Sequence, residues 1–344
     1  MEIDKKFITL FLSIFVLIII AGISQVLFSP ANRQTEAKIF IIGKGEAVRE
    51  IAVNLKEEKL INNVNAFVAY AAITGKYSKI QAGEYLLSSQ MSTAQIVGIL
   101  SRGETAKENL TIIEGWDLRD INEYLTDKGI ATKDELYSLT GNPAKEEINS
   151  NVEKFANEFD FLKDKPENMS LEGYLFPDTY YIDKGDTLET ITEKMLFNFD
   201  EKLTQELRNE IKKQKKTIFE IITMASMIEK EVKTLEDKKI VSGILWKRMS
   251  SGMRLQVDAT ILYAEAKEGL KIYTKDTQIN SPYNTYRVDG LPIGPISNPG
   301  TDSIMAAVYP TKTSYYYYLS APDGRTIFSK TLDEHNYNKA KYLK

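Results

Sequence analysis

The chain opens with a long apolar run. Residues 7–28 read FITLFLSIFVLIIIAGISQVLF and contain no charged side chain. Twenty-two helical residues at about 1.5 Å each span about 33 Å, enough to cross a hydrocarbon layer of about 30 Å. We therefore predict a transmembrane anchor, with residues 1–6 in the cytoplasm because Lys5 and Lys6 precede the run. The alternative is a cleaved signal peptide, although the apolar part of such a peptide is usually only about 7–15 residues long.

A polar linker over residues 29–37 precedes a segment in which strand and helix patterns alternate. Val48, Ile51 and Leu55 recur at helical spacing, with charges between them. Ser92 is a suitable helix N-cap, and Gly103 is a suitable helix stop. The pattern predicts a strand, two helices, a returning strand and a third helix. Their expected ranges are 38–42, 48–55, 65–74, 83–87 and 93–102.

A glycine-led pattern in this segment recurs 70 residues later, at Gly45 and again at Gly115. Both copies place an aliphatic residue, an arginine and an isoleucine at the same offsets after the glycine. The first unit, over residues 38–104, is similar to a LysM module, a βααβ domain that binds N-acetylated glycan chains. We predict a second LysM-like or connecting unit over residues 105–150. An exterior protein with such units points towards peptidoglycan.

The amino-acid composition excludes several kinds of functional site. Lys and Arg number 44 against 48 Asp and Glu, a net charge of −4, so the bulk charge does not suggest a nucleic-acid surface. There is no cysteine, which excludes disulfides and thiolate metal sites. The one histidine, His335, excludes metal sites built from several histidines. No cofactor is expected.

The segment TIFEIITMASMIEKEV, at residues 217–232, predicts a helix whose apolar side carries one acidic residue. On a helical wheel Glu229 falls within the apolar arc, whereas Glu220 and Glu231 fall on the opposite side. Burial among apolar neighbours favours the protonated form of a carboxyl group, which is what a general acid needs. The alternative is that Glu229 forms a buried ion pair, with Arg254 or Lys233 as its partner.

Five ordered motifs strengthen this interpretation. The chain resembles the endolytic murein transglycosylase family (MltG, YceG-like) along essentially its whole length. The motifs that carry the resemblance are Glu172-Gly-Tyr-Leu-Phe-Pro-Asp-Thr-Tyr180, Ala225-Ser-Met-Ile-Glu-Lys-Glu231, Leu255-Gln-Val-Asp-Ala-Thr260, Tyr283-Asn-Thr-Tyr286, and Gly290-Leu-Pro with Asn298-Pro-Gly300. The resemblance implies that Glu229, the first glutamate of Glu-Lys-Glu, is the catalytic residue. Expected glycan contacts are Gln256, Asp258, Tyr283, Asn284, Tyr286 and Asn298.

The sequence departs from the family pattern at three positions. Ile293 and Ala259 stand where prolines are common, and Thr326 stands where many members have histidine. A role for that histidine is therefore in doubt here. His335 falls in the C-terminal Glu-His pattern of the family, and we interpret it as structural.

The resemblance implies a lytic transglycosylase. Protonated Glu229 would donate its proton to the oxygen that links N-acetylmuramic acid to N-acetylglucosamine. The C6 hydroxyl of the muramyl sugar would then attack C1 and close a 1,6-anhydro ring, so that a second catalytic carboxylate is not required. The expected partners are nascent peptidoglycan strands, the cell membrane and the penicillin-binding peptidoglycan synthases. The enzyme would end strand elongation from outside a bacterial cell membrane, where a single-pass anchor would hold it.

Two other functions remain open. One is a hydrolytic muramidase, in which Asp258 or another carboxylate activates water; alternatively, Asp258 pairs with Arg254 and is only structural. The other is a peptidoglycan-binding scaffold without catalysis. The predicted organisation is an α+β protein with a tail at 1–6, an anchor at 7–28, a linker at 29–37, LysM-like units at 38–104 and 105–150, and an α+β catalytic domain at 151–344.

Overall fold

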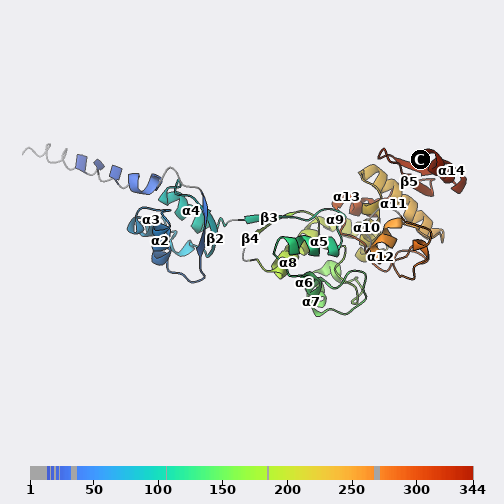
Figure 1. The fold of residues 1–344 in the computed structure, drawn as a ribbon, viewed down its shortest axis with the longest axis horizontal. Helices are drawn as coiled ribbons and strands as arrows, with labels where there is room; N and C mark the ends of the chain where they lie inside the picture. The colour runs from blue at the N-terminus through green and yellow to red at the C-terminus, as the bar shows by residue number, and fades with distance from the viewer. Residues whose placement is uncertain are drawn as a thin grey trace, which may run out of the picture. The chain divides into compact units, whose positions relative to one another are not determined.

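The structure is a computed structural model, and it describes residues 37–105, 107–183, 186–266 and 272–343, together with 14–15, 17–18, 21–22 and 24–31. The described chain is a mixture of helices and three two-stranded sheets, as the α+β prediction expected (Figure 1). It divides into two compact units. The first comprises residues 1–109 and 181–186, and the second comprises residues 110–180 and 187–344.

The predicted membrane anchor needs correction. Within the described residues, no helix is both long enough and apolar enough to cross a bilayer. This finding contradicts the single-pass membrane location that the sequence suggested. Part of the apolar run, at residues 7–13, 16, 19–20 and 23, lies outside the described residues, and the tail at 1–6 lies outside them as well.

The first unit follows the predicted strand–helix–helix–strand order. Strands β1 and β2 pair antiparallel, with Phe40 opposite Tyr85. Their inner faces and the helices close over a core of aromatic and aliphatic side chains that includes Phe67 and Leu100. Ser92 forms a capping box with Gln95 at the start of α4. The elements of this unit are β1 (Lys38–Ile42), α2 (Val48–Glu57), α3 (Val64–Ile73), η1 (Tyr77–Lys79), β2 (Gly83–Leu87) and α4 (Thr93–Arg102).

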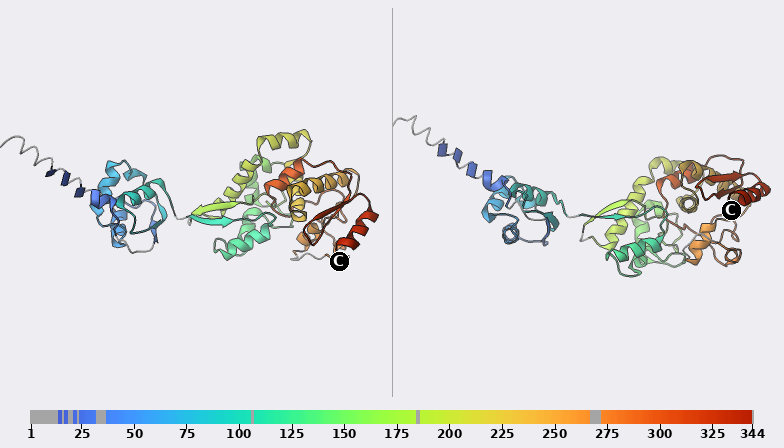
Figure 2. Two further views of the ribbon diagram at one scale, coloured as in Figure 1. Left: turned by 90° about the horizontal axis from the view of Figure 1, so that it is seen from above. Right: turned by 45° about the horizontal axis from the view of Figure 1, so that its top comes forward.

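The segment predicted as a second LysM-like unit is built differently from the first. It contains the strand β3 (Lys107–Thr111), followed by the helices α5 (Leu118–Asp127) and α6 (Glu135–Thr140). The strand β3 pairs with β4 (Thr179–Asp183), about 70 residues further along the chain (Figure 2). Within described residues 107–150, the βααβ order of the first unit is therefore not repeated.

Three helices form the centre of the second unit. Helix α10 (Ile218–Glu231) packs against both α11 (Leu235–Ser250) and α13 (Thr301–Val308) (Figure 1). A capping box of Thr217 and Glu220 starts α10, confirming the helix predicted at this position. All eight residues from Ile221 to Ile228 are buried, on every side of the helix. Helix α10 is thus a central helix rather than a surface helix with one apolar face.

A hairpin and a helix complete the C-terminal end. Strands β5 (Tyr317–Ser320) and β6 (Thr326–Ser329) pair antiparallel, and α14 (Leu332–Tyr342) lies along both strands (Figure 2). The remaining elements of this unit are α7 (Ser150–Glu158), η2 (Asp160–Leu162), α8 (Leu188–Lys202), α9 (Gln205–Lys213), α12 (Asp258–Glu265) and η3 (Asp276–Gln278).

Candidate active site

A cleft of about 700 Å³ lies in the second unit, where the end of α10 meets the start of α12 and the C-terminal hairpin and helix. Three of the predicted glycan contacts, Gln256, Asp258 and Tyr286, line it. The other lining residues are Lys230, Glu231, Arg248, Tyr317, Tyr318, Leu319, Ser320, Leu332, His335, Asn336, Lys339 and Leu343. Its wall therefore combines carboxyl groups, aromatic rings and cations, which suits a polar sugar ligand.

Glu231, the last residue of α10, brings an unusual carboxyl group to this cleft. Burial, helped by the nearby charge of Asp258, raises the pKa of Glu231 to about 7, although hydrogen bonds from Tyr318 and the Ala259 backbone act to lower it. The negative end of a helix dipole also disfavours a carboxylate at this position. A carboxylic acid that holds its proton near neutral pH can act as a general acid.

The neighbours of Glu231 are themselves held in place. Asp258 accepts a hydrogen bond from the hydroxyl of Tyr286, and Arg254 pairs instead with the carboxylate of Asp289, at 3.3 Å. Gln256 adopts a φ of +51°, a backbone conformation that non-glycine residues rarely adopt. Its backbone N–H donates to the Thr285 carbonyl at 3.1 Å. Such a strained turn is maintained only where its surroundings fix it. The side chain of Gln256 lines the cleft and accepts a hydrogen bond from Arg248 Nη2 at 2.7 Å.

Glu229 lies in a different environment. Its Oε1 accepts a hydrogen bond from Lys238 Nζ at 2.9 Å, and the Glu229 and Lys238 side chains are only 8% and 3% exposed. Its Oε2 accepts the backbone N–H of Gly300 at 2.9 Å, at the start of α13. The ion-pair alternative considered for this residue is therefore present, with Lys238 as the partner instead of Arg254 or Lys233. Glu229 is not among the residues that line the cleft.

The other three predicted glycan contacts are framework residues in this structure. Tyr283 is 2% exposed, and its ring packs against that of Tyr263 with centroids 4.9 Å apart. The buried amide of Asn284 donates to the carbonyls of Thr277 and Ile279. All three side chains, including that of Asn298, are buried and packed within the protein. Glycan contact by these three residues stays a prediction.

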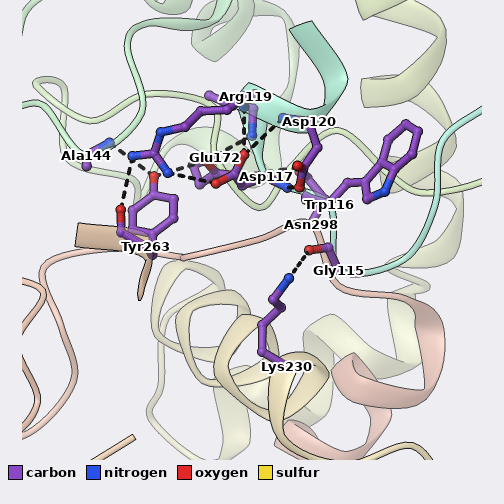
Figure 3. Close-up of polar contacts among 11 residues, drawn as sticks. Gly115, Trp116, Asp117, Arg119, Asp120, Ala144, Glu172, Lys230, Tyr263 and Asn298 are labelled. Carbon is purple, nitrogen blue, oxygen red and sulfur yellow. Dashed lines mark hydrogen bonds and ion pairs between the residues drawn. The ribbon is translucent and has the colours of Figure 1, made fainter. Parts of the chain in front are cut away.

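Asn298 belongs to a polar network around buried Glu172, drawn in Figure 3. Asn298 Nδ2 donates to the Trp116 carbonyl at 2.9 Å. Its Oδ1 accepts the Leu175 N–H, also at 2.9 Å. Glu172 is 1% exposed and accepts the Tyr263 hydroxyl at 3.0 Å. Burial raises the pKa of Glu172 well above its usual range. This network joins segments that lie far apart in the sequence, which is a structural role.

Lys230 connects this network to α10. Figure 3 shows its side chain extended toward the second glycine-led motif, where Nζ donates to the Gly115 carbonyl at 3.0 Å. The middle residue of the Glu-Lys-Glu motif therefore fixes the end of α10. The two glutamates of the motif lie in different surroundings: Glu229 forms an ion pair with Lys238, and Glu231 lines the cleft.

A second hollow of about 760 Å³ is lined mainly by residues from α6 and the segment that leads into α7, with Arg119 from α5. None of its lining residues belongs to the five sequence motifs. Two acidic residues, Asp134 and Glu147, line this hollow. The pKa of Glu147 lies below the usual value because its side chain accepts hydrogen bonds from Asn142. A carboxylate stabilised in this way is a poor proton donor, so the motif-lined cleft is the better candidate site.

The sequence analysis did not place Glu231 or Arg248 in the site. For the tyrosines at residues 315–318, which include those of β5, it expected only alternation along a strand, with two rings in the core and two exposed. The helical wheel was used to find a carboxylate on an apolar face, but α10 is buried all round, so the wheel could not identify the side that faces a cleft. One signal was available. Glu231 is the last acidic residue before the predicted helix ends, and a side chain at a helix end often meets other segments.

The second unit thus carries a cleft in which a carboxyl group with a raised pKa meets aromatic and cationic side chains. The YceG-like family model matches residues 40–341, and the chain belongs to this family. An endolytic murein transglycosylase of Bacillus subtilis is 34% identical over 325 residues, which cover 92% of this chain and 88% of that protein. One of the same name from Streptococcus pneumoniae strain D39 is 31% identical over 88% of this chain, but over only 58% of its own length.

A solved structure shows the same likeness. The crystal structure of a YceG-like protein from Listeria monocytogenes is 34% identical in sequence and has a TM-score of 0.60. The match covers 88% of this chain and 99% of that one. The resemblance inferred from the five motifs is thereby confirmed at the level of the family.

Proposed function

We propose that this chain is a murein transglycosylase that cleaves peptidoglycan glycan strands, with Glu231 as its general acid and base. The observation that carries the proposal is a carboxyl group with a pKa raised to about 7 that lines a cleft formed by family motifs. The proposal also rests on relatives named endolytic murein transglycosylase. The sequence prediction of Glu229 as the catalytic residue is the competing assignment within the same function.

The proposed reaction proceeds in two proton transfers. Protonated Glu231 donates to the oxygen between N-acetylmuramic acid and the next N-acetylglucosamine as that bond breaks. The muramyl C1 gains oxocarbenium character, and the sugar's own C6 hydroxyl attacks it. The carboxylate of Glu231 takes the hydroxyl proton, which returns the acid to its starting state and leaves a 1,6-anhydro end. No water is consumed, and one carboxyl group performs both transfers.

The remaining cleft residues support this chemistry. Asp258 disfavours the ionised form of Glu231 by its charge and so helps to keep the acid protonated. Tyr286 and Gln256 are proposed to contact the sugar, since their side chains line the cleft beside these carboxyl groups. The LysM-like unit is proposed to bind glycan. Association with peptidoglycan synthases and the ending of strand growth are the remaining parts of the predicted role.

A hydrolytic muramidase is the second candidate, because Asp258 places a second carboxyl group in the same cleft as Glu231. In that reaction Asp258 would activate water or stabilise the sugar cation, as in glycosidases with two carboxyl groups. The two functions differ in their products and not in their substrate.

The masses of the new chain ends distinguish the two reactions. Digestion of uncrosslinked peptidoglycan by the purified full chain is expected to give muramyl ends that are one water lighter than reducing ends. The measurement is mass spectrometry of the digest, with a reference muramidase digest as the control. Reducing ends throughout would establish the hydrolytic reaction, and the absence of any cleavage would reject both enzymatic functions.

A further inference from the structure

One cation in the cleft lacks an anionic partner. Arg248, on α11, lines the cleft and is only 6% exposed. Buried arginines are normally paired with carboxylates, because an unpaired buried charge is costly. Among the residues that the structure describes, no carboxylate forms an ion pair with Arg248, whereas exposed Arg254, Arg325 and Arg102 each have one.

Arg248 also has hydrogen-bonding capacity to spare. A guanidinium group carries five N–H donors. Two of them have partners: Nη1 donates to the Leu255 carbonyl at 3.0 Å, and Nη2 donates to Gln256 Oε1 at 2.7 Å. Its Nε is buried and has no partner within the described chain. Burial lowers the pKa of Arg248 below its usual value, which reflects the cost of holding this charge without a counter-ion.

The surroundings favour an anion at this position. Lys230 and Lys339 add two cations to the same wall, and His335 contributes a buried Nδ1 without a partner in the described residues. Of the two acidic residues in the cleft, Glu231 keeps its proton up to about pH 7. Asp258 accepts a hydrogen bond from the hydroxyl of Tyr286. The cleft therefore carries more positive than negative charge near neutral pH.

We propose that Arg248 is a substrate-binding residue that recognises a carboxylate carried by the muramyl side of the glycan. This inference rests on the proposed function and names the substrate feature that the site selects. The planar fork of arginine matches a carboxylate with two parallel hydrogen bonds, and such charge-assisted bonds are the strong ones. The carboxylate can come from two sources: the free lactyl group of a bare strand, or the peptide attached to that group.

A simpler role for Arg248 would be to hold the Leu255–Gln256 turn, since both of its occupied donors bind there. That role predicts an equal loss of affinity for charged and uncharged glycans when Arg248 is changed. Recognition of an anion predicts a loss only for the charged forms. The ratio of the two affinities therefore separates the roles, even where the substitution also affects folding.

The test uses short glycans in matched charged and neutral forms, bound to the full chain carrying Glu231→Gln so that they are not cut. One pair is the bare strand and its lactyl methyl ester, and the other is a peptide-bearing strand and its amidated form. Calorimetry is expected to show the charged member of at least one pair binding about tenfold tighter than its neutral member. The pair that shows this preference identifies the source of the carboxylate.

Adding Arg248→Gln is expected to bring that ratio close to one, while Arg248→Lys keeps part of it because the charge remains. The matched control is Lys247→Gln, which removes the same charge from the neighbouring residue of α11 but outside the lining of the cleft. Equal binding of charged and neutral forms in both pairs, or an unchanged ratio after Arg248→Gln, would overturn the inference. Failure to bind any of the four glycans would instead reject the proposed function, and this inference with it.

Discussion

Glu231→Gln is expected to lower kcat/KM for glycan cleavage by about 10²- to 10⁴-fold, the contribution typical of a positioned general acid. Glutamine keeps the size of the side chain and an oxygen for the hydrogen bonds from Tyr318 and Ala259, but it cannot donate an acidic proton. Rates of release of new chain ends from uncrosslinked peptidoglycan provide the measurement.

The thermal stability of Glu231→Gln is the control, because a loss of activity indicates a catalytic role only if the variant stays folded. Because the pKa of Glu231 is raised from 4.5 to about 7 on folding, the folded state binds its proton more tightly than the unfolded chain does. The ionised side chain therefore destabilises the fold as pH rises from about 4.5 through 7. At pH 8 the midpoint of thermal unfolding of Glu231→Gln should be no lower than that of the native chain. Retention of full activity by Glu231→Gln would remove it from the mechanism.

Glu229→Gln is expected to act mainly on stability, lowering the free energy of unfolding by about 3 kcal/mol. Removing one partner of a buried ion pair typically costs about 3–5 kcal/mol, because the other charge is left uncompensated. The low end applies here, since the carboxyl group of Glu114 is close enough for its pKa to respond to both Glu229 and Lys238, and it can replace part of the lost charge. Urea denaturation at pH 7 measures the change.

The double variant Glu229→Gln with Lys238→Met is the control for this prediction. Removing the stranded cation should recover part of the lost stability, since the buried charge is then gone. Folded Glu229→Gln protein should still cut glycan at a rate within about tenfold of the native chain. A stable Glu229→Gln protein without activity would return the catalytic role to Glu229, as the sequence prediction had it.

The comparison of Glu229 and Glu231 shows what the sequence could and could not predict. The helix over residues 217–232, its capping threonine and the importance of the Glu-Lys-Glu motif followed from local patterns, which the sequence contains. The choice between the two glutamates depends on their partners Lys238, Gly300 and Tyr318, which lie 9 to 87 residues away along the chain. Such contacts are set by how α11, α13 and the C-terminal hairpin pack, and no helical period encodes them.

The predicted glycan contacts fall into two groups, which again depend on packing between distant segments. Gln256, Asp258 and Tyr286 reach the cleft, while Asn284 and Asn298 donate to backbone carbonyls within the protein. Asparagine in a loop serves either as a ligand contact or as a partner for backbone groups, and the residue type alone does not distinguish the two uses. In the first unit, by contrast, strand and helix order followed from hydrophobic period and from caps such as Ser92, which act over a few residues.

Titration of the Glu231 carboxyl group is the most direct test of the central claim. The measurement is ¹³C NMR of side-chain carboxyl carbons in the labelled full chain, with the signal of Glu231 assigned by its absence from the spectrum of Glu231→Gln. We predict a midpoint close to pH 7, with the acid protonated below it and charged above it, because burial and the charge of Asp258 raise its pKa. A midpoint near 4.5, the ordinary value for a glutamate, would contradict the account.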